Sequence, residues 1–303
     1  MTTDTITRRG AGLTKARPRG RGLPFAPALG LLPFAIYITV FLGIPAVLAV
    51  LSGFQTKRGA FTLNNLGVFT DPKVLATFGS TIWLAAVAAI IGAILGVLIC
   101  LALLGLPATS RVRTFTNAAT SVLAQFGGVT LAFAFIATVG RTGLLTQFLD
   151  NTLGINIVEN GVWLYSLGGL VLPYVYFSTP LMVITFMPAL AALKPQWAEA
   201  NLALGGTRLG FWRHIGIPVL APSFFASLLL LFAGAFSAYA TAAALVSQGA
   251  PIVPIGIENA LTSESVLGRA GIAGVYATGM ILVVVVVMFA YARIQQRAER
   301  WQR

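Results

Sequence analysis

Residues 199–218 read EANLALGGTRLGFWRHIGIP, a polar segment that separates two long apolar stretches of the chain. These stretches, 160–193 and 215–257, contain no Asp, Glu, Lys or Arg. Four more charge-free intervals cover 22–56, 74–110, 114–140 and 270–292. Each interval exceeds the roughly 20 residues with which a helix spans a bilayer. The pattern predicts an all-α polytopic membrane protein with about six transmembrane helices.

The composition leads to the same class. Apolar residues make up 57% of the 303 positions and charged residues only 9%, with a mean hydropathy of +0.87. A soluble domain carries about a quarter charged residues. A membrane-spanning barrel needs alternating segments of about 10 residues, and the sequence has none.

The net charge of +12 is distributed by topology. If the N-terminus is cytoplasmic, the inside segments 1–21, 111–113, 194–214 and 293–303 hold fifteen of the twenty basic residues. The outside segments then hold five basic and five acidic residues. This is the positive-inside asymmetry, so the excess charge requires no nucleic-acid partner. We expect both termini in the cytoplasm.

The organisation follows from these boundaries. We expect a basic cytoplasmic tail at 1–24, a transmembrane domain at 25–294 and a second cytoplasmic tail at 295–303. The expected helices cover about 26–51, 78–104, 117–139, 162–192, 218–248 and 270–292. Gly92 and Gly96 predict close helix packing within the chain, with a dimer face as the alternative. The segment 249–265 is too broken for another span, and its role stays open.

The polar segment predicts a bent pair of short helices. Pro195 suits a first helical turn, Gly205 and Gly206 interrupt the helix, and Thr207 can cap the next one. The bend should expose Trp197, Phe211 and Trp212. These rings could anchor in the groove of a partner, or could lie at the membrane interface, where Trp is enriched.

The same segment resembles the EAA loop of binding-protein-dependent ABC importer permeases, type I. The family pattern is Glu-Ala-Ala, three residues, Gly, nine residues, Ile, one residue and Leu-Pro. Five positions of the chain fall on that spacing: Glu199, Ala200, Gly205, Ile215 and Pro218. Asn201 replaces the third-position Ala, and Ile217 replaces the Leu before the proline.

The resemblance implies a type I permease fold and a coupling loop at 194–218 that enters a cleft on an ATP-binding subunit. The coupling residues would be Trp197, Glu199, Ala200, Gly205, Gly206, Arg208, Phe211, Trp212, Ile215 and Pro218. The implied partners are two ATP-binding subunits, a second permease subunit (a paralogue or a copy of this chain) and an extracytoplasmic solute-binding protein. The chain itself would need no cofactor, because ATP and Mg would bind to the partner ATPase.

An enzyme is not expected. The sequence contains no Gly-rich loop ending in Gly-Lys-Ser/Thr, and its one histidine, His214, has no neighbouring ligand residue. An ion-coupled secondary transporter is the rival class. Such carriers usually place ionisable residues within their spans, although broken helices can also bind ions through backbone carbonyls.

The solute path is predicted from polar and aromatic residues interleaved with small ones. These are Gln125 and Gly128, Tyr174 and Ser178, and Ser237, Tyr239 and Thr241, each of which could equally serve helix packing. Leu204-Gly205-Gly206 resembles the polyamine, ferric-ion and phosphonate branch of the family. We therefore expect a small polar solute, with a polyamine first and a sugar, ferric ion or phosphonate as alternatives.

Overall fold

The computed structural model describes residues 25–302 except 57–59, 108, 156, 158–162, 247–250 and 263–269. Within these ranges the chain is helical, and the one extended pairing is an isolated antiparallel bridge between Gln55 and Phe61. Six helical segments of the described chain are long and apolar enough to cross a membrane. The predicted class and number of spans are therefore confirmed. The basic tail expected at 1–24 lies outside the described residues.

The chain divides into two compact units, Met1–Leu48 and Ala49–Arg303. The helix expected at 26–51 is present as α1 Phe25–Ile38, the π-helical turn η1 Thr39–Gly43 and α2 Ile44–Gly53. Pro33 lies inside α1. The exposed apolar side chains of this stretch suit a membrane-spanning helix, because lipid and not water is the surrounding solvent.

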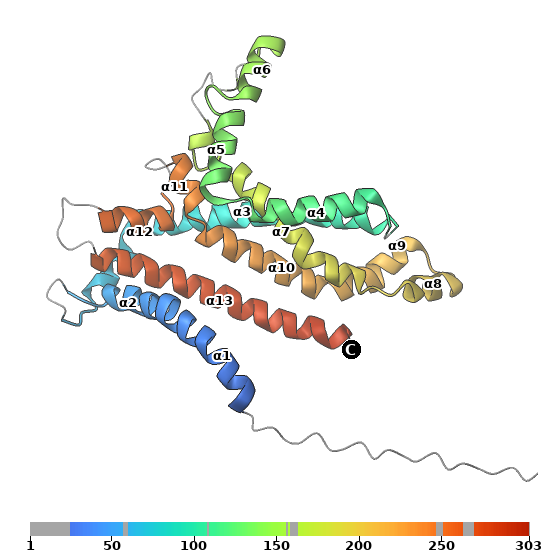
Figure 1. Ribbon diagram of the computed structural model, residues 1–303, viewed down its shortest axis with the longest axis horizontal. Coiled ribbons are helices and arrows are strands. Elements are labelled where there is room, and N and C mark those ends of the chain that lie inside the picture. The colour runs from blue at the N-terminus through green and yellow to red at the C-terminus, as the bar shows by residue number, and fades with distance from the viewer. Residues whose placement is uncertain are drawn as a thin grey trace, which may run out of the picture. The chain divides into compact units, whose positions relative to one another are not determined.

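The second unit contains the remaining elements. In chain order they are η2 Asn64–Thr70, α3 Pro72–Leu104, α4 Arg111–Gln125, α5 Gly128–Val139, α6 Leu144–Leu153, η3 Trp163–Tyr165, α7 Val171–Ala191, α8 Pro195–Ala203, α9 Arg208–Phe211, η4 Trp212–Gly216, α10 Ile217–Ser237, α11 Ala240–Val246, α12 Val253–Thr262 and α13 Ala270–Gln302. Helices α3, α4, α7, α10 and α13 run alongside one another, with α8 and α9 at one end and α12 at the other (Figure 1). The C-terminal segment 295–302 continues α13.

Helices α3 and α7 form the most extensive contact, and glycine makes it possible. A Cβ atom on Gly92 would lie 2.6 Å from the Cβ of Ser178, and one on Gly96 would lie 2.5 Å from the Cβ of Met182. Small residues at such crossings let two backbones approach within a membrane. The spaced glycines therefore pack within the chain, as predicted.

Two predicted helices are wrong as single elements. The helix expected at 117–139 is interrupted at Phe126 and Gly127, between α4 and α5. The helix expected at 218–248 is interrupted at Ala238 and Tyr239, between α10 and α11. The first interruption has a local cause, because Gly128 adopts a φ of 66°. Positive φ values of this kind favour glycine. The second interruption has no glycine or proline, and the carbonyl that it releases takes part in a tertiary contact described below.

Two other expectations are adjusted. The helix expected at 162–192 begins as regular α-helix only at Val171, after the short turn η3. Part of the open segment 249–265 forms α12, a ten-residue helix. Helix α12 packs against α13 and α3. It is too short to span a bilayer alone.

Candidate functional site

The coupling loop forms the bent helix pair that the sequence predicts. Helix α8 has proline in its first turn, and Gly205 follows it with a φ of 80°. A Cβ atom at Gly205 would meet no atom within 4 Å, so it is the backbone conformation that favours glycine there. The hydroxyl of Thr207 then accepts a hydrogen bond from the Gly210 N–H at 3.0 Å and caps α9. We call α8, Leu204–Thr207 and α9 the elbow.

Asn201 closes the elbow from inside. Its Nδ2 donates to the Thr207 carbonyl at 3.0 Å, and its own carbonyl accepts from the Gly206 N–H at 2.8 Å. A Cβ on Gly206 would lie 2.5 Å from the Asn201 side-chain oxygen, so glycine is also needed there. In sequence, Asn201 stands only as a departure from the family pattern. In the structure it is the residue that braces the turn.

The aromatic anchors are placed differently from the prediction. Phe211 is buried, and Trp197 and Trp212 are half-buried, so the expectation that the bend exposes these rings is wrong. Phe211 meets Trp212 edge to face, with 5.8 Å between ring centroids. Both rings line a cavity of about 420 Å³ between the elbow and the end of α3 at Leu104. Burial of apolar surface turns these rings toward the helical body.

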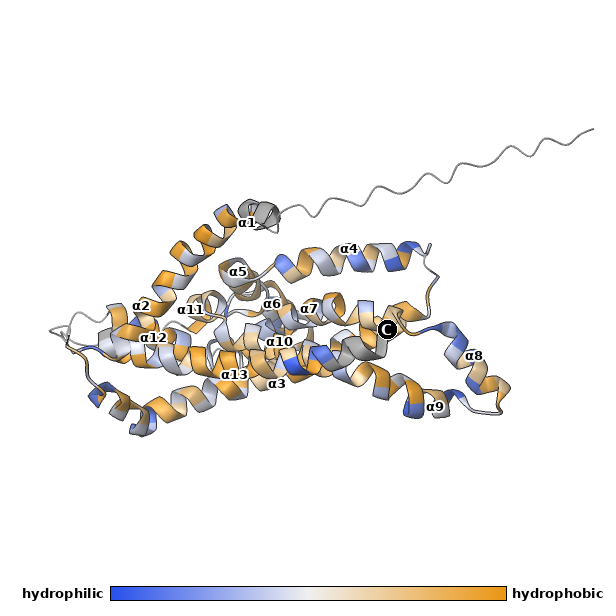
Figure 2. Cartoon of the chain, turned by 90° about the horizontal axis from the view of Figure 1, so that it is seen from below, coloured by the Kyte–Doolittle hydropathy of each residue, from blue (hydrophilic) through white to orange (hydrophobic). Residues whose placement is uncertain are grey.

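The elbow instead exposes three leucines. Leu202, Leu204 and Leu209 are 53%, 89% and 78% exposed. We call these residues the leucine tip. Three strongly exposed leucines within eight residues of a polar segment are typical of an interaction site. Hydrophilic residues occupy much of the rest of α8 (Figure 2).

The other predicted coupling residues lie on α8, α9, η4 and α10. Glu199, Ala200, Arg208 and Pro218 are exposed, and Ile215 is half-buried. His214 has a local role, because its Nδ1 lies 3.0 Å from the Gly210 carbonyl oxygen. In the described part of the chain, no three His, Cys, Asp or Glu side chains gather as metal ligands would.

The two helix interruptions lie side by side. The Thr241 hydroxyl of α11 donates to the Gly128 carbonyl of α5 at 3.1 Å. The Tyr174 hydroxyl of α7 donates to the Ala238 carbonyl at 2.8 Å. That carbonyl lies where α10 ends, so Tyr174 satisfies a backbone group that the interruption releases. We call these two hydrogen bonds and the two interruptions the double break.

The predicted path residues divide into two groups. Gln125, Ser237 and Tyr239 are exposed at the double break. Tyr174, Ser178 and Thr241 are buried between helices, so for them the packing interpretation holds in this conformation. Among the described residues the Ser178 hydroxyl has no hydrogen-bond partner, and the Ser178 Cβ lies at the close crossing with Gly92.

Tyr239 is linked to α12. It lies between α10 and α11, outside the six candidate spans. Hydrogen bonding to the Glu258 carboxylate, with smaller effects of desolvation and of that negative charge, raises the pKa of Tyr239. An acidic group therefore lies beside the double break.

The polar face of α4 was missed in the sequence. Thr114, Asn117, Ser121 and Gln125 are all exposed and recur at helical spacing, so they share one face of the helix. This face leads to the double break, because Gln125 is the last residue of α4. Figure 2 shows hydrophilic positions along α4. The signal was available, since Thr, Asn, Ser and Gln recur inside an interval judged only by its lack of charge.

Similarity to known proteins agrees with this geometry. Residues 148–300 match a family described as "Binding-protein-dependent transport system inner membrane component". The chain is 29% identical over 167 residues to the sulfate transport system permease protein CysT of Salmonella typhimurium, a match covering 54% of this chain and 56% of that protein. It is 29% identical over 94 residues to the ferric transport system permease protein FbpB of Actinobacillus pleuropneumoniae, covering 31% of this chain and 13% of that protein. The chain thus spans about half the length of the Salmonella relative.

Solved structures share the fold. A chain of a bacterial ABC transporter involved in the import of the acidic polysaccharide alginate superposes with a TM-score of 0.65 at 15% identity, covering 90% of this chain and 95% of that one. A chain of the MetNI methionine ABC transporter superposes with a TM-score of 0.54 at 16% identity, covering 74% and 95%. The predicted type I importer permease fold is confirmed.

Proposed function

Because this chain belongs to the family of binding-protein-dependent transport system inner membrane components, we propose that it is the transmembrane permease subunit of an ATP-driven ABC importer. The observation that carries the proposal is the elbow, which presents the leucine tip on a glycine bend braced by Asn201. A connecting loop with no partner would gain nothing by exposing three leucines to water. The chain forms half of a solute path and is not an enzyme, because a partner subunit hydrolyses ATP.

In this mechanism the leucine tip enters a groove of the ATP-binding subunit. When two such subunits close on ATP, each displaces the elbow that it holds. Helical backbone continues without a gap from Arg208 through η4 into α10, so the displacement reaches Ser237 along one rigid element. The double break lies at the far end of that element. It is therefore the part of the path whose shape responds to the elbow.

The path runs along the exposed polar face of α4 and past Gln125, Ser237 and Tyr239. One chain supplies only one wall, so a second permease, a paralogue or a copy of this chain, covers the other side. An extracytoplasmic solute-binding protein delivers solute, and two ATP-binding subunits hold ATP and Mg. The position of the double break, at the far end of the helical element that begins in the elbow, supports the assignment of the path.

The proposed topology places the elbow in the cytoplasm of a bacterium and the chain in its inner or cytoplasmic membrane. Both termini are cytoplasmic, with tails at 1–24 and 295–303 flanking the transmembrane domain 25–294. The excess of basic residues in the inside segments supports this orientation.

For the solute we propose a small ion. The sulfate and ferric permeases among the relatives support this class. Sulfate ranks first because that similarity covers more of this chain. A cation, ferric ion or polyamine, is the second candidate, and the Glu258 carboxylate beside Tyr239 favours it. The polyamine expectation stays a prediction.

The test is solute-stimulated ATP hydrolysis. The chain is reconstituted in lipid vesicles with its ATP-binding subunits, its partner permease and the solute-binding protein. Stimulation by sulfate, ferric ion or spermidine identifies the solute class. ATP hydrolysis that responds to none of several ion and sugar probes, combined with uptake driven by an ion gradient without ATP, refutes the importer and favours the secondary carrier.

A further inference from the structure

A second cavity lies at the end of the helical body opposite the elbow, and nothing in the proposed transport cycle uses it. It measures about 560 Å³ and lies among the start of α3, α12 and α13. This size is typical of small-molecule sites. Two of the six candidate spans begin beside it, at Pro72 and Gly271. The cavity therefore lies beside the first residues of two candidate spans.

The cavity is amphipathic. Its floor consists of the buried apolar residues Val74, Ile252 and Ile255. Its rim carries exposed polar residues, Asp71, Lys73 and Asn259. A ligand that matches both surfaces has a polar head and an apolar tail.

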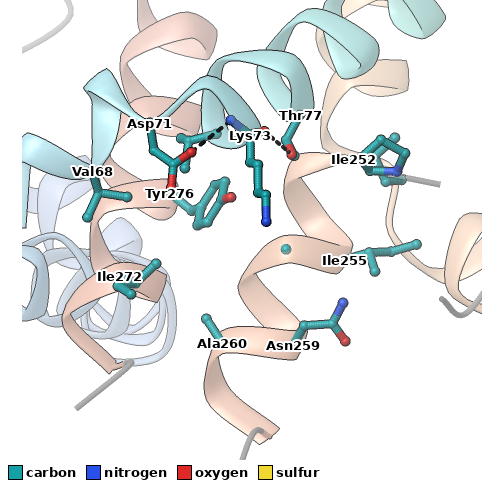
Figure 3. A pocket seen from close by; sticks show the side chains of 13 residues that line it. Val68, Asp71, Lys73, Thr77, Ile252, Ile255, Asn259, Ala260, Ile272 and Tyr276 are labelled. Atoms are coloured by element: carbon teal, nitrogen blue, oxygen red, sulfur yellow. Dashed lines mark hydrogen bonds between the residues drawn. The ribbon is translucent and has the colours of Figure 1, made fainter. Parts of the chain in front are cut away.

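The Lys73 side chain points into the cavity and not along its own helix. Figure 3 shows the Lys73 side chain reaching from α3 into the cavity toward α12, away from Asp71. Lys73 lies in the first turn of α3, where the helix dipole disfavours a cation. Local helix stability therefore gives no reason for a lysine at this position.

The carboxylate of Asp71 restricts the kind of head group. Its Oδ1 accepts the Lys73 N–H at 2.9 Å and caps α3, which leaves the second oxygen on the rim. A simple anion would be attracted by the Lys73 ammonium but repelled by this carboxylate. A head group with a phosphate and an ammonium a few ångströms apart satisfies both.

The aromatic side chains beside the cavity indicate its position along the membrane normal. Tyr276, on its wall, stacks on Phe78 with ring centroids 5.9 Å apart, and Phe78 contacts Phe69 at the same distance. Tyrosine and other amphipathic rings concentrate at head-group level in membrane proteins. A tyrosine on the cavity wall therefore favours a position at head-group level.

We propose that this cavity binds the zwitterionic head group of a phospholipid of the ethanolamine type. The Lys73 ammonium takes the phosphate, and the Asp71 carboxylate takes the lipid ammonium. The glycerol and the first acyl carbons lie on the floor of Val74, Ile252 and Ile255. The lipid holds α12 against α3 and α13 at this end of the chain.

Native mass spectrometry of the full-length chain in detergent tests the site, with added phosphatidylethanolamine, phosphatidylglycerol and glycerophosphoethanolamine. Wild type should bind phosphatidylethanolamine on the order of 10-fold better than phosphatidylglycerol, since one charge-assisted contact differs. Asp71→Asn retains an N-cap residue and should lose this preference. Lys73→Gln should bind both lipids about 10-fold less. Arg141→Gln, an exposed cation outside the cavity, should behave as wild type.

Two results would overturn the proposal. Unchanged lipid binding by both Asp71→Asn and Lys73→Gln would remove the head-group site. Glycerophosphoethanolamine, which has no acyl chains, binding as tightly as the lipid would show that the cavity takes a soluble solute instead.

Discussion

The elbow and the double break are both bends in a helical chain, but they are stabilised in different ways. The elbow is closed by contacts within seven residues, from Asn201 to Thr207, and exposes its apolar tip. The double break is closed by hydrogen bonds between residues 64 and 113 positions apart, and both donors are buried. A locally closed bend can move as a unit, whereas a bend held by distant helices must respond to their movement. This difference fits the proposed coupling, in which the elbow moves with the ATP-binding subunit and the double break changes shape in response.

The largest effect is expected at the elbow glycine, whose φ is 80°. Gly205→Val places a β-branched residue in this left-handed region, where non-glycine residues cost about 1–2 kcal/mol and bulky ones are outliers. The bend should change, and ATP-driven uptake by the reconstituted complex should fall at least about 10-fold. Gly205→Asn is the matched control, because asparagine tolerates this region and the site has open space. If the two variants transport equally well, the bend does not matter for coupling.

The next effect is expected at the double break. Tyr174→Phe removes the donor to the Ala238 carbonyl and should lower the free energy of unfolding by about 1–2 kcal/mol. Thermal unfolding of the purified chain in detergent measures this change. An unchanged midpoint would mean that the interruption of α10 is maintained without Tyr174.

A smaller effect is expected at the second hydrogen bond of the double break. Thr241→Val removes the hydroxyl that reaches Gly128 and should cost about 0.6–1 kcal/mol, the usual size of such bonds in membranes. Thr138→Val is the control, since Thr138 bonds only to Ala134 in its own helix. Equal midpoints for the two variants would argue against a specific bond between α11 and α5.

The smallest effect concerns pH. The Glu258 carboxylate raises the pKa of Tyr239. The contact between these two side chains therefore stabilises the fold fully at pH values below the ordinary tyrosine pKa. That stabilisation is lost as the pH rises through the raised pKa of Tyr239. Glu258→Gln should move the titration of Tyr239 toward lower pH. The phenolate absorbance of wild type and Glu258→Gln, each minus its Tyr239→Phe counterpart, measures the shift. A titration that stays in place would separate Tyr239 from Glu258.

The same comparison explains what could be predicted from the sequence. The elbow was predictable because its determinants are local: proline in the first turn, glycine at the bend and a threonine cap. The spans were predictable because a bilayer imposes a minimum apolar length. The interruption at Ala238 was not predictable, because no glycine or proline marks it and the hydroxyl that satisfies its free carbonyl lies on α7, 64 positions away in sequence.

The aromatic residues of the elbow illustrate a second limit. Phe211 and Trp212 were expected to face a partner, since their positions in a polar segment suggest exposure. The structure turns both toward the cavity beside Leu104, which Leu202 also lines, and leaves Leu204 and Leu209 outside it. Which side of a short helix faces the body depends on the end of α3, which lies far earlier in the chain. Sequence spacing alone carries no such information.

The central claim is that the elbow holds the ATP-binding subunit through the leucine tip, and binding of that subunit tests it most directly. The full-length chain in lipid nanodiscs is titrated with the purified ATP-binding subunit, comparing wild type, Leu204→Asp and Leu261→Asp. Leu261 is a 65% exposed leucine of α12, at the other end of the helical body (Figure 1). Leu204→Asp should weaken binding at least about 10-fold, because a carboxylate would be buried without a partner, whereas Leu261→Asp should bind as wild type. Equal binding by Leu204→Asp and wild type would contradict the claim.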